Sequence, residues 1–512
     1  MYTLGIDVGG THIDYAVVDE KNRLVYGHKI LAEGDLAQAI AQGLRDLEER
    51  HRFDLRQLRD LHLGTTLAMN SLLELRSLYK VGLLRLAGHA PDFPPAYGWP
   101  EAHRSTILAA SRTVAGGREY NNQCCKPLQR DTLLRAVDEL LAAGAESLAV
   151  VGVFSPLYAE DELLAADWIR KEISPTLPVS LSSQLGSLGY IVRENTTLLN
   201  AALKKVLKKG FNTLLSLLKD LGFQGECQLT QNNGTLLTLD EALEYPVKTL
   251  VSGPTNSLSG ACKLAQVENA VVVDIGGTST DLGVVENGFP VYSLKGGNIA
   301  GIACNLLAAE ITALAMGGGS LVRYQAQGFT VGPESVGAAL FKMCTTYGGN
   351  HLTVYDLAQI LSKTRNPQAE AVLAFLVQKI KDEAQALVPE SARKPILLVG
   401  GGSANIPDYL MAADFIRPPH YPIANAYGAA LAEVSGQIDC LVQLKAGEDG
   451  LLQDLEEKAK MLALQKGAAA SSLRIIEKKV LPLSYLDEPL YRVLITAAGR
   501  KALSPEYQRH VS

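Results

Sequence analysis

The chain has 512 residues, of which 47% are hydrophobic and 20% charged, an ordinary composition for a globular protein with room for roughly two to four domains. The net charge of −6 disfavours a nucleic-acid partner or an anionic membrane surface. The seven cysteines are scattered without a CxxC pair, and no basic leader precedes the first strand. We therefore expect a reduced, cytoplasmic protein without a zinc site.

The first predicted element is a β-hairpin that occurs twice in the chain. Residues 5–18 read GIDVGGTHIDYAVV, and residues 271–285 read VVVDIGGTSTDLGVV. At one fixed offset, the identical positions are Asp7 and Asp274, Gly9 and Gly276, Gly10 and Gly277, Thr11 and Thr278, Asp14 and Asp281, Val17 and Val284, and Val18 and Val285. The repeat predicts two related lobes that face each other.

The composition of these hairpins suits a polyphosphate. A Gly-Gly turn lets backbone N–H groups converge on an anion, neighbouring hydroxyls add donors, and an aspartate can hold hydrated Mg²⁺. We assign Asp7 and Asp274 to Mg²⁺ and water positioning, with Thr11 beside them at the reacting phosphate. The expected phosphate contacts are Gly9, Gly10, Thr11, Gly276, Gly277, Thr278 and Ser279. A tight hairpin with a capping aspartate is the alternative, and the second copy makes it weaker.

After the first hairpin, the sequence predicts a third strand at 22–30 and an amphipathic helix at 36–48. A short strand at 61–63 then runs into Gly-Thr-Thr and a second helix. Thr65, Thr66 and Asn70 in this segment are candidate substrate contacts, because the hydroxyls precede a helix N-terminus. A simple helix cap is an equally good interpretation.

Strands and helices alternate in the next part of the chain, which is the α/β signature. An irregular excursion at 91–117 is followed by helices at 131–143 and 159–173 and strands at 147–154 and 178–182. A long helix at 193–218 contains Arg193 and Glu194, which either contact substrate or form an ion pair on the helix surface. Short strands at 227–231 and 234–238 precede the second hairpin.

Two glycine triplets follow the second hairpin. The apolar window 302–322, interrupted by Glu310, predicts a buried helix entering the first triplet and not a membrane span. The second triplet follows a strand at 396–399, and its backbone without side chains can lie against a nucleoside. The nucleotide-binding candidates here are Gly317, Gly318, Gly319, Gly400, Gly401 and Gly402. A small-residue helix at 421–436, a charged helix at 451–465 and strands at 473–483 and 491–498 complete the chain.

Several of these segments together resemble the hydantoinase/oxoprolinase family, within the actin and sugar-kinase ATPase superfamily. The segments are GIDVGGT, LGTTLAMNSLLE, RENTTLLNAAL, TLVSGPTNSLSGA, DIGGTSTD, VGPES, LVGGGSANIPDY and ANAYGAALAE. The resemblance implies a two-lobed α/β fold with duplicated ribonuclease-H-like domains. Its expected parts are an N-terminal lobe at 1–195, a second lobe at 196–438 and a small α+β extension at 439–512.

The resemblance also implies a function. Family members use ATP and Mg²⁺ to open a cyclic amide, such as 5-oxoproline or a hydantoin, by phosphorylating the ring carbonyl. A partner subunit of the hydantoinase B type is expected, and a homodimer is a further expectation. The same hairpins also suit a small-metabolite kinase, or an ATPase subunit that activates or assembles a protein partner.

The chain departs from the family pattern at three places. Leu63 stands where the family usually has histidine before Gly-Thr-Thr, residues 116–119 read GGRE in place of a Gly-Gly-His-Asp element, and residues 310–312 read EIT in place of Asp-Ile-His. These are groups expected near the substrate or a second metal, whereas the nucleotide groups are retained. The sequence therefore supports ATP binding more strongly than ring opening.

Overall fold

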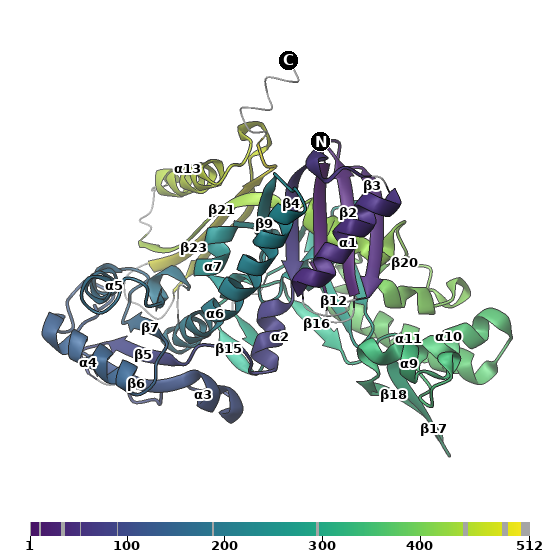
Figure 1. Cartoon of the computed structure of the whole chain (residues 1–512), viewed down its shortest axis with the longest axis horizontal. Helices are drawn as coiled ribbons and strands as arrows, with labels where there is room; N and C mark the ends of the chain where they lie inside the picture. The colour runs from purple at the N-terminus through teal and green to yellow at the C-terminus, as the bar shows by residue number, and fades with distance from the viewer. Residues whose placement is uncertain are drawn as a thin grey trace.

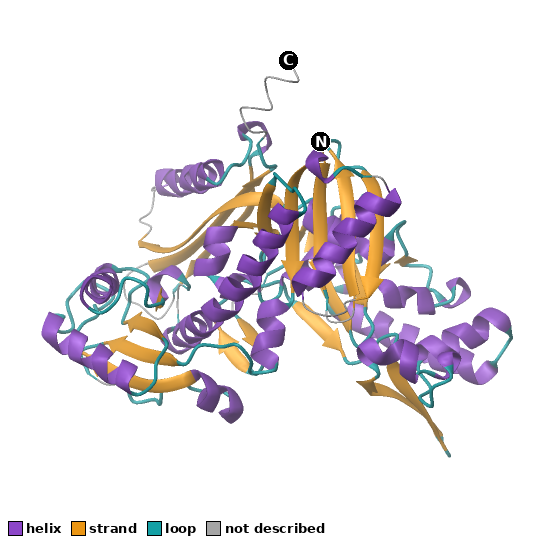
Figure 2. Ribbon diagram, viewed as in Figure 1, coloured by secondary structure: helices purple, strands orange, loops and turns teal. Residues whose placement is uncertain are grey.

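The computed structural model describes residues 2–9, 12–31, 36–51, 53–89, 91–186, 189–292, 296–443, 449–483 and 490–502. Gly10 and Thr11 of the first hairpin therefore lie outside the described residues. Figure 1 shows two large parts on either side of the central strands β1 to β4, and Figure 2 shows that both parts contain helices and strands. Within the described residues, no helix is both long and apolar enough to cross a membrane.

The largest sheet has nine strands in the order β22-β23-β21-β10-β9-β4-β1-β2-β3. Their bounds are β1 Tyr2–Val8, β2 His12–Asp19, β3 Leu24–Leu31, β4 Leu58–Thr65, β9 Glu226–Thr230, β10 Thr235–Thr238, β21 Glu433–Gln443, β22 Arg474–Pro482 and β23 Leu490–Gly499. Alternate residues of β1 point to opposite faces. Leu4 and Ile6 lie in the same hydrophobic core as residues of α1 (Leu36–His51) and the long helix α6 (Tyr190–Asp220), while the opposite face contacts α12 (Ala424–Ala430).

The second sheet repeats the topology of the first. Its order is β13-β12-β11-β19-β20, with β16 also paired to β12. The bounds are β11 Ala270–Ile275, β12 Thr280–Glu286, β13 Phe289–Pro290, β16 Ile311–Leu314, β19 Ile396–Val399 and β20 Phe415–Ile416. Strand β11 pairs antiparallel with β12 and parallel with β19, as β1 does with β2 and β4. The expected duplication of ribonuclease-H-like domains is therefore confirmed.

Two helices lie between the duplicated sheets. Helix α8 (Ser252–Ala265) packs against β11 and β19, α12 packs against β1 and β2, and the two helices contact each other closely. A Cβ at Gly260 would lie 1.8 Å from the carbonyl oxygen of Ala424, and one at Gly428 would lie 2.0 Å from that of Asn256. The two helix backbones touch at these glycines, so the two lobes are joined by one tightly packed helix pair.

A four-stranded sheet forms a side layer at the lower left of Figure 1, in the order β6-β5-β7-β8. It contains β5 Val81–Leu86, β6 Leu108–Val114, β7 Ser147–Gly152 and β8 Val179–Leu181, with α3 Glu101–Ile107, α4 Arg130–Ala142 and α5 Glu160–Glu172. The expected irregular excursion at 91–117 was wrong, because it contains α3 and the edge strand β6. The edge strand carries partly exposed polar residues and gives a weak periodic signal.

The buried helix expected at 302–322 was also wrong. The segment contains β15 (Ile302–Cys304), β16 and the start of β17 (Ser320–Gln325). Strand β15 pairs with β14 (Gly297–Ile299), and β17 pairs with β18 (Gly328–Ser335). Short apolar runs do not distinguish buried strands from helices by periodicity alone. The helix expected at 421–436 is likewise shorter, since α12 ends at Ala430 and β21 begins at Glu433.

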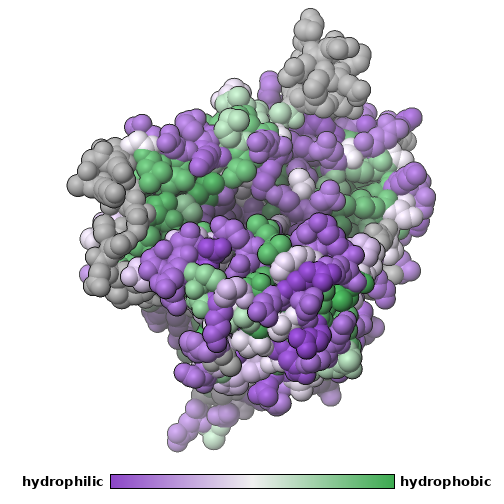
Figure 3. Space-filling view, turned by 90° about the vertical axis from the view of Figure 1, so that its left-hand side faces the viewer, coloured by the Kyte–Doolittle hydropathy of each residue, from purple (hydrophilic) through white to green (hydrophobic). Residues whose placement is uncertain are grey.

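The remaining elements complete the two halves. They are α2 Leu67–Leu73, α7 Leu239–Glu244, α9 Leu340–Met343, α10 Val354–Lys363, α11 Pro367–Ala386 and α13 Asp449–Gln465. Helix α13 packs on β21 and β23, so the C-terminal elements extend the nine-stranded sheet. That sheet draws strands from all three expected segments, 1–195, 196–438 and 439–512, whose boundaries stay a prediction. Figure 3 shows the side layer's face of the molecule, where hydrophilic residues cover most of the surface.

Candidate functional site

The two hairpins have the same backbone geometry. Asp7 pairs across the strands with Asp14, and Asp274 pairs with Asp281 at the equivalent register. In the first hairpin the N–H of Gly9 donates to the carbonyl of the residue three positions later at 2.9 Å, and in the second Gly276 does the same at 2.9 Å. The repeated sequence thus gives a repeated turn, with an aspartate pair at the base of each. The region where these hairpins meet is called the two-hairpin junction below.

Helix α8 contacts the aspartates of both hairpins. Asn256 donates through its side-chain amide to Asp7 Oδ1 at 3.2 Å, and the Ser257 hydroxyl donates to Asp274 Oδ2 at 2.5 Å. Sequence reasoning assigned no role to either residue. The available signals were the resemblance of the TLVSGPTNSLSGA segment to the family and its run of small polar residues, which is uncommon inside a helix.

Helix α12 and strand β3 contribute two further residues that sequence reasoning missed. The Asn425 amide lies 3.0 Å from Asp7 Oδ2 and 2.7 Å from Asp14 Oδ2. The Lys29 ammonium lies 2.9 Å from the same Asp14 oxygen. A Cβ at Gly401 would lie 3.8 Å from the Lys29 nitrogen, so this lysine stands between the first hairpin and the second glycine triplet.

The surroundings of the four aspartates at the two-hairpin junction disfavour their ionised form. Burial and the charge of Asp14 raise the pKa of Asp7 to about 6, against the lowering effect of its amide donors. Burial and Asp274 raise the pKa of Asp281 to about 7, and burial raises the pKa values of Asp14 and Asp274. A cation placed here would offset the desolvation and the mutual repulsion.

The donor set suits a hard divalent cation that keeps part of its own water. No three His, Cys, Asp or Glu side chains within the described residues form a complete metal cage. Magnesium is commonly held by one or two carboxylates together with waters and phosphate oxygens. Asp7 and Asp274 fit that mode of binding, which needs no dedicated protein cage.

The glycine triplets meet the second hairpin. Gly318 N–H donates to the Gly276 carbonyl at 2.9 Å, and Gly319 N–H donates to the Gly277 carbonyl at 2.7 Å. A Cβ at Gly402 would lie 2.6 Å from the Gly276 oxygen, whereas the nearest atom to one at Gly401 is Lys29 Cε at 3.6 Å. Most of these glycines are required by loop packing, and Gly401 is the one that leaves room for a ligand.

Similar close packing holds at the neighbouring loops. A Cβ at Gly317 would lie 2.8 Å from the Gly276 carbonyl oxygen, and one at Gly400, which has φ of 80°, would lie 2.0 Å from Asp274 Oδ1. The structure therefore brings the second hairpin and both triplets together. In the second hairpin, Thr278 is exposed and Ser279 half-buried beside these loops.

The Gly-Thr-Thr segment lies directly beside the first hairpin. A Cβ at Gly64 would lie 2.2 Å from Asp7 Oδ1. The Thr66 hydroxyl donates to the Val8 carbonyl at 3.0 Å, Asn70 donates to Thr66 at 3.2 Å, and Thr65 accepts the N–H of Leu67 at 3.0 Å. These side chains are thus engaged with the hairpin and the start of α2, and their contact with a substrate stays a prediction.

Arg193 and Glu194 lie elsewhere, where α6 meets the side layer. Both are buried: Arg193 donates to the Gly152 carbonyl at 2.6 Å, and Glu194 accepts from Arg85 at 2.7 and 2.8 Å. The ion pair expected on the helix surface is therefore wrong, because Glu194 pairs with Arg85 in the interior. These hydrogen bonds place both residues at the side layer, apart from the two-hairpin junction.

Two family models match most of the chain. The hydantoinase/oxoprolinase N-terminal region matches residues 3–173, and hydantoinase/oxoprolinase matches residues 193–396. The chain belongs to the hydantoinase/oxoprolinase family. The matches include both hairpins, Gly-Thr-Thr, α8 and the first glycine triplet, and the second model ends at the start of β19.

Relatives in this family include the caprolactamase subunit alpha of Pseudomonas jessenii, 27% identical over 69% of this chain and 53% of its own length. The 5-oxoprolinase 1 of Arabidopsis thaliana is 30% identical over 70% of this chain and 31% of its own length. The chain thus spans about half or less of these two relatives. The crystal structure of the ATP-dependent caprolactamase from Pseudomonas jessenii superposes with a TM-score of 0.78 at 20% identity, covering 98% of this chain and 88% of that one.

Proposed function

We propose that this chain is an ATP- and Mg²⁺-dependent hydrolase that opens a cyclic amide of the 5-oxoproline or hydantoin type. The observation that carries the proposal is the two-hairpin junction, where α8 binds Asp7 through Asn256 and Asp274 through Ser257. Membership of the hydantoinase/oxoprolinase family supports the same chemistry.

In this proposal the two hairpins hold a nucleotide triphosphate between them. Backbone N–H groups of the turns that follow Asp7 and Asp274 would donate to phosphate oxygens, and Gly401 leaves space for the nucleoside. Asp7 and Asp274 would hold Mg²⁺ through water, and the bound ion would neutralise phosphate charge and align the triphosphate. Phosphoryl transfer mainly needs this positioning, which explains why an activated serine or cysteine nucleophile is unnecessary.

The proposed reaction has three steps. The ring carbonyl oxygen bonds to the γ-phosphorus while the bond from that phosphorus to ADP breaks. One water adds to the carbonyl carbon and the ring C–N bond breaks, with the amine nitrogen taking a proton. A second water hydrolyses the resulting acyl phosphate, which releases inorganic phosphate and leaves the free carboxylate. Asn256, Ser257 and Asn425 position the aspartates during these steps and do not touch the ring.

A partner subunit of the hydantoinase B type is part of the proposal. The relative from Pseudomonas jessenii is named as a subunit alpha, so that protein works as one subunit among others. The substrate contacts proposed for Thr65, Thr66 and Asn70 lie at the edge of the first hairpin, where a ring held by a second subunit would reach the triphosphate. Arg193 and Glu194 would act on substrate only indirectly, by holding the side layer against α6.

The test is release of ADP from Mg-ATP by the purified chain, alone and with a co-expressed partner subunit. The rings are 5-oxoproline, hydantoin and N-methylhydantoin, and the opened acid is measured in the same samples. We expect one ring to stimulate ADP release with an equal amount of opened acid. A stable phosphorylated product would contradict the proposal in favour of a kinase, and ATP turnover without any ring would favour an activator of a protein partner.

A further inference from the structure

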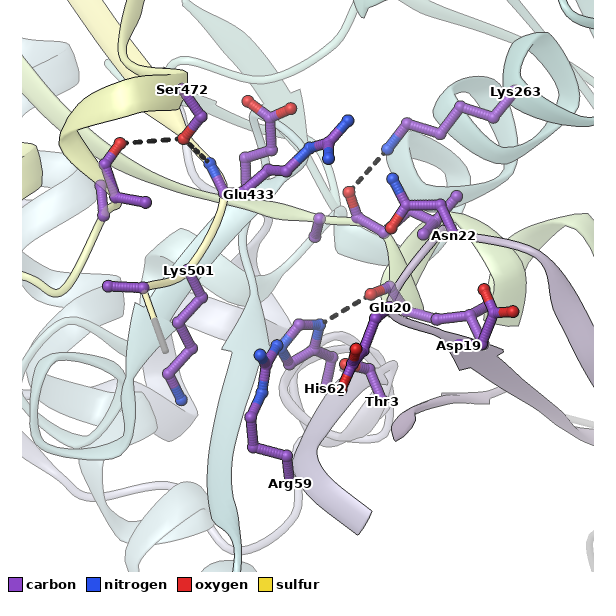
Figure 4. A pocket seen from close by; sticks show the side chains of 18 of the residues that line it. Thr3, Asp19, Glu20, Asn22, Arg59, His62, Lys263, Glu433, Ser472 and Lys501 are labelled. Atoms are coloured by element: carbon purple, nitrogen blue, oxygen red, sulfur yellow. Dashed lines mark hydrogen bonds between the residues drawn. The ribbon is translucent and has the colours of Figure 1, made fainter. Parts of the chain in front are cut away.

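A pocket of about 1280 Å³ lies at the start of β1, whereas the two-hairpin junction lies at the other end of this strand. It is lined by the start of β1, by β4, by the ends of α8 and α12, and by the C-terminal residues 468–472 and 500–502. Thr3 lines the pocket and Asp7 lies four residues further along β1, so the two sites are roughly 13 Å apart along this strand. Figure 4 shows Lys263 entering from α8 on one side and Ser472 and Lys501 from the C-terminal residues on the other.

Basic residues outnumber acidic residues on the pocket wall. The basic residues are Arg59, Lys263, Arg474, Arg500 and Lys501, and the acidic residues are Asp19, Glu20 and Glu433. Several of the basic residues are neutralised. Arg474 forms two hydrogen bonds with Glu433 at 2.8 and 3.1 Å, and Lys501 lies 2.7 Å from Asp60 Oδ1.

The charge of Arg59 is also neutralised by Asp60, because the Arg59 guanidinium lies 2.5 Å from the second carboxylate oxygen of Asp60. Lys263 and Arg500 are different. Within the part of the chain that the structure describes, neither has an ion pair with a carboxylate. Lys263 and Arg500 are therefore the basic residues of the wall that are best placed to pair with a bound anion.

Lys263 is the more enclosed of these two residues. Its ammonium donates to the Leu431 carbonyl at 2.7 Å, where α12 ends. Burial lowers the pKa of Lys263 to about 8, with smaller lowering contributions from the charges of Arg474 and Arg500 and an opposite contribution from Glu433. An anion beside this lysine would stabilise the ammonium form, because it would supply a hydrogen-bonded negative charge that no ion pair of Lys263 within the described residues supplies.

We propose that this pocket binds a small organic anion carrying a carboxylate or phosphate group, held by Lys263 and Arg500, and that its binding is linked to binding at the two-hairpin junction. The ligand is small because it must fit between folded elements. The contacts are charge-assisted hydrogen bonds from one enclosed ammonium and one exposed guanidinium.

The linkage follows from the helices that reach both sites. Helix α8 carries Asn256 and Ser257 near its start and Lys263 near its end. Helix α12 carries Asn425 near its start, and the Leu431 carbonyl follows its end. The close contact of the two helices at Gly260 makes them a single rigid pair, so a ligand that shifts their pocket ends also shifts the donors that hold the aspartates.

The binding half of the proposal is tested by calorimetry without nucleotide. Glutarate and inorganic phosphate are each titrated into the whole chain, which separates a carboxylate ligand from a phosphate ligand. We expect at least one of them to bind, and Lys263→Met and Arg500→Gln each to weaken it at least about tenfold, as expected for one charge-assisted hydrogen bond. Lys458→Met on the exposed face of α13 removes the same charge outside the pocket and is the matched control.

Absence of binding by either probe, or equal affinity in wild type and both pocket variants, would overturn the site. Arg500 is exposed, so its variant tests the site even where Lys263→Met impairs folding. The linkage half rests on the proposed function, because it uses the dissociation constant of the Mg-bound non-hydrolysable ATP analogue. That constant is measured with and without saturating anion.

We expect the anion to change nucleotide affinity about threefold or more, and nucleotide to change anion affinity by the same factor, since linkage is reciprocal. Lys263→Met should abolish this effect. Anion binding with unchanged nucleotide affinity would overturn the linkage while the site stands. Failure of the analogue to bind at all would overturn the proposed function and the linkage together, whereas the anion measurement made without nucleotide would keep its own result.

Discussion

Asn256 and Ser257 are adjacent on helix α8, yet they donate to aspartates of different hairpins, Asp7 and Asp274. These aspartates belong to two separate sheets, which are 9-stranded and 6-stranded. One peptide unit therefore fixes the spacing between the two halves of the junction. Any rotation or slide of α8 changes both contacts at once, so the helix position sets the geometry offered to the triphosphate.

Removal of the Ser257 hydroxyl tests this relationship. Ser257→Ala removes a hydrogen bond to the half-buried carboxylate of Asp274, so we expect kcat for ATP hydrolysis to fall at least about tenfold with the fold retained. Ser259→Ala is the matched control, because Ser259 is also buried in α8 and has no hydrogen bond to a junction aspartate. Equal rates in the two variants would contradict a positioning role for Ser257.

Asp274→Asn should separate activity from stability. The charge of this half-buried carboxylate is unfavourable without a cation, because desolvation raises its pKa. We expect the substitution to abolish Mg-ATP turnover while leaving the melting temperature of the metal-free protein unchanged or higher. Melting curves with and without Mg²⁺ check this, and a large drop in metal-free stability would show that Asp274 is mainly structural.

The second glycine triplet offers a matched pair of substitutions. In Gly401→Ala the new Cβ lies at ordinary contact distance from Lys29, so we expect a normal melting temperature. Nucleotide binding should be at least about tenfold weaker, because the added methyl group occupies space that the nucleoside needs. Gly402→Ala meets the Gly276 carbonyl oxygen at 2.6 Å and should destabilise the fold by about 1–3 kcal/mol.

The two triplet variants are compared by thermal unfolding and by nucleotide titration. Unchanged nucleotide affinity in a folded Gly401→Ala protein would remove the second triplet from the nucleotide site. Loss of stability in Gly401→Ala equal to that in Gly402→Ala would show that both glycines serve packing alone.

His62 should give the protein an acid-sensitive step. Burial lowers the pKa of this histidine to about 4, and its Nδ1 lies 3.0 Å from the Ala429 carbonyl oxygen. In the unfolded chain His62 is therefore protonated below about pH 6.5, whereas in the folded chain it is protonated only below about pH 4. Stability due to neutral His62 is complete above pH 6.5 and is lost as the pH falls, by about 1.4 kcal/mol per pH unit across this interval.

Urea unfolding between pH 7 and pH 4.5 measures this loss. In His62→Gln the free energy of unfolding should fall less steeply with falling pH than in wild type. The difference in slope should correspond to the uptake of about one proton on unfolding. His89→Gln changes an exposed histidine and is the control. Parallel pH profiles for His62→Gln and wild type would contradict the depressed pKa.

The hairpins were predictable because their information is local. Apolar strand residues, a Gly-Gly turn and an aspartate pair all lie within one short segment, and the chain repeats it. The helix positions in the centre of the fold were harder. Helix α8 starts with Ser-Gly-Pro and contains several small polar residues, so its sequence has little helical propensity, and it forms because two sheets pack on it.

The missed site residues act over long sequence separations. Asn425 contacts Asp7 across 418 positions and Asn256 contacts it across 249. A single sequence carries no local signal for such contacts, whereas the topology produces them. Arg193 and Glu194 show the opposite case, because their charged side chains suggested a surface or a substrate and the fold buries them instead.

The most direct test of the account is a crystal structure of the chain with Mg²⁺ and a non-hydrolysable ATP analogue. We predict that the triphosphate lies between the turns at Gly9 and Gly276, with Mg²⁺ held through water by Asp7 and Asp274 and the nucleoside beside Gly401. A nucleotide bound elsewhere, or one that contacts only one of the two hairpins, would contradict the two-hairpin junction as the nucleotide site.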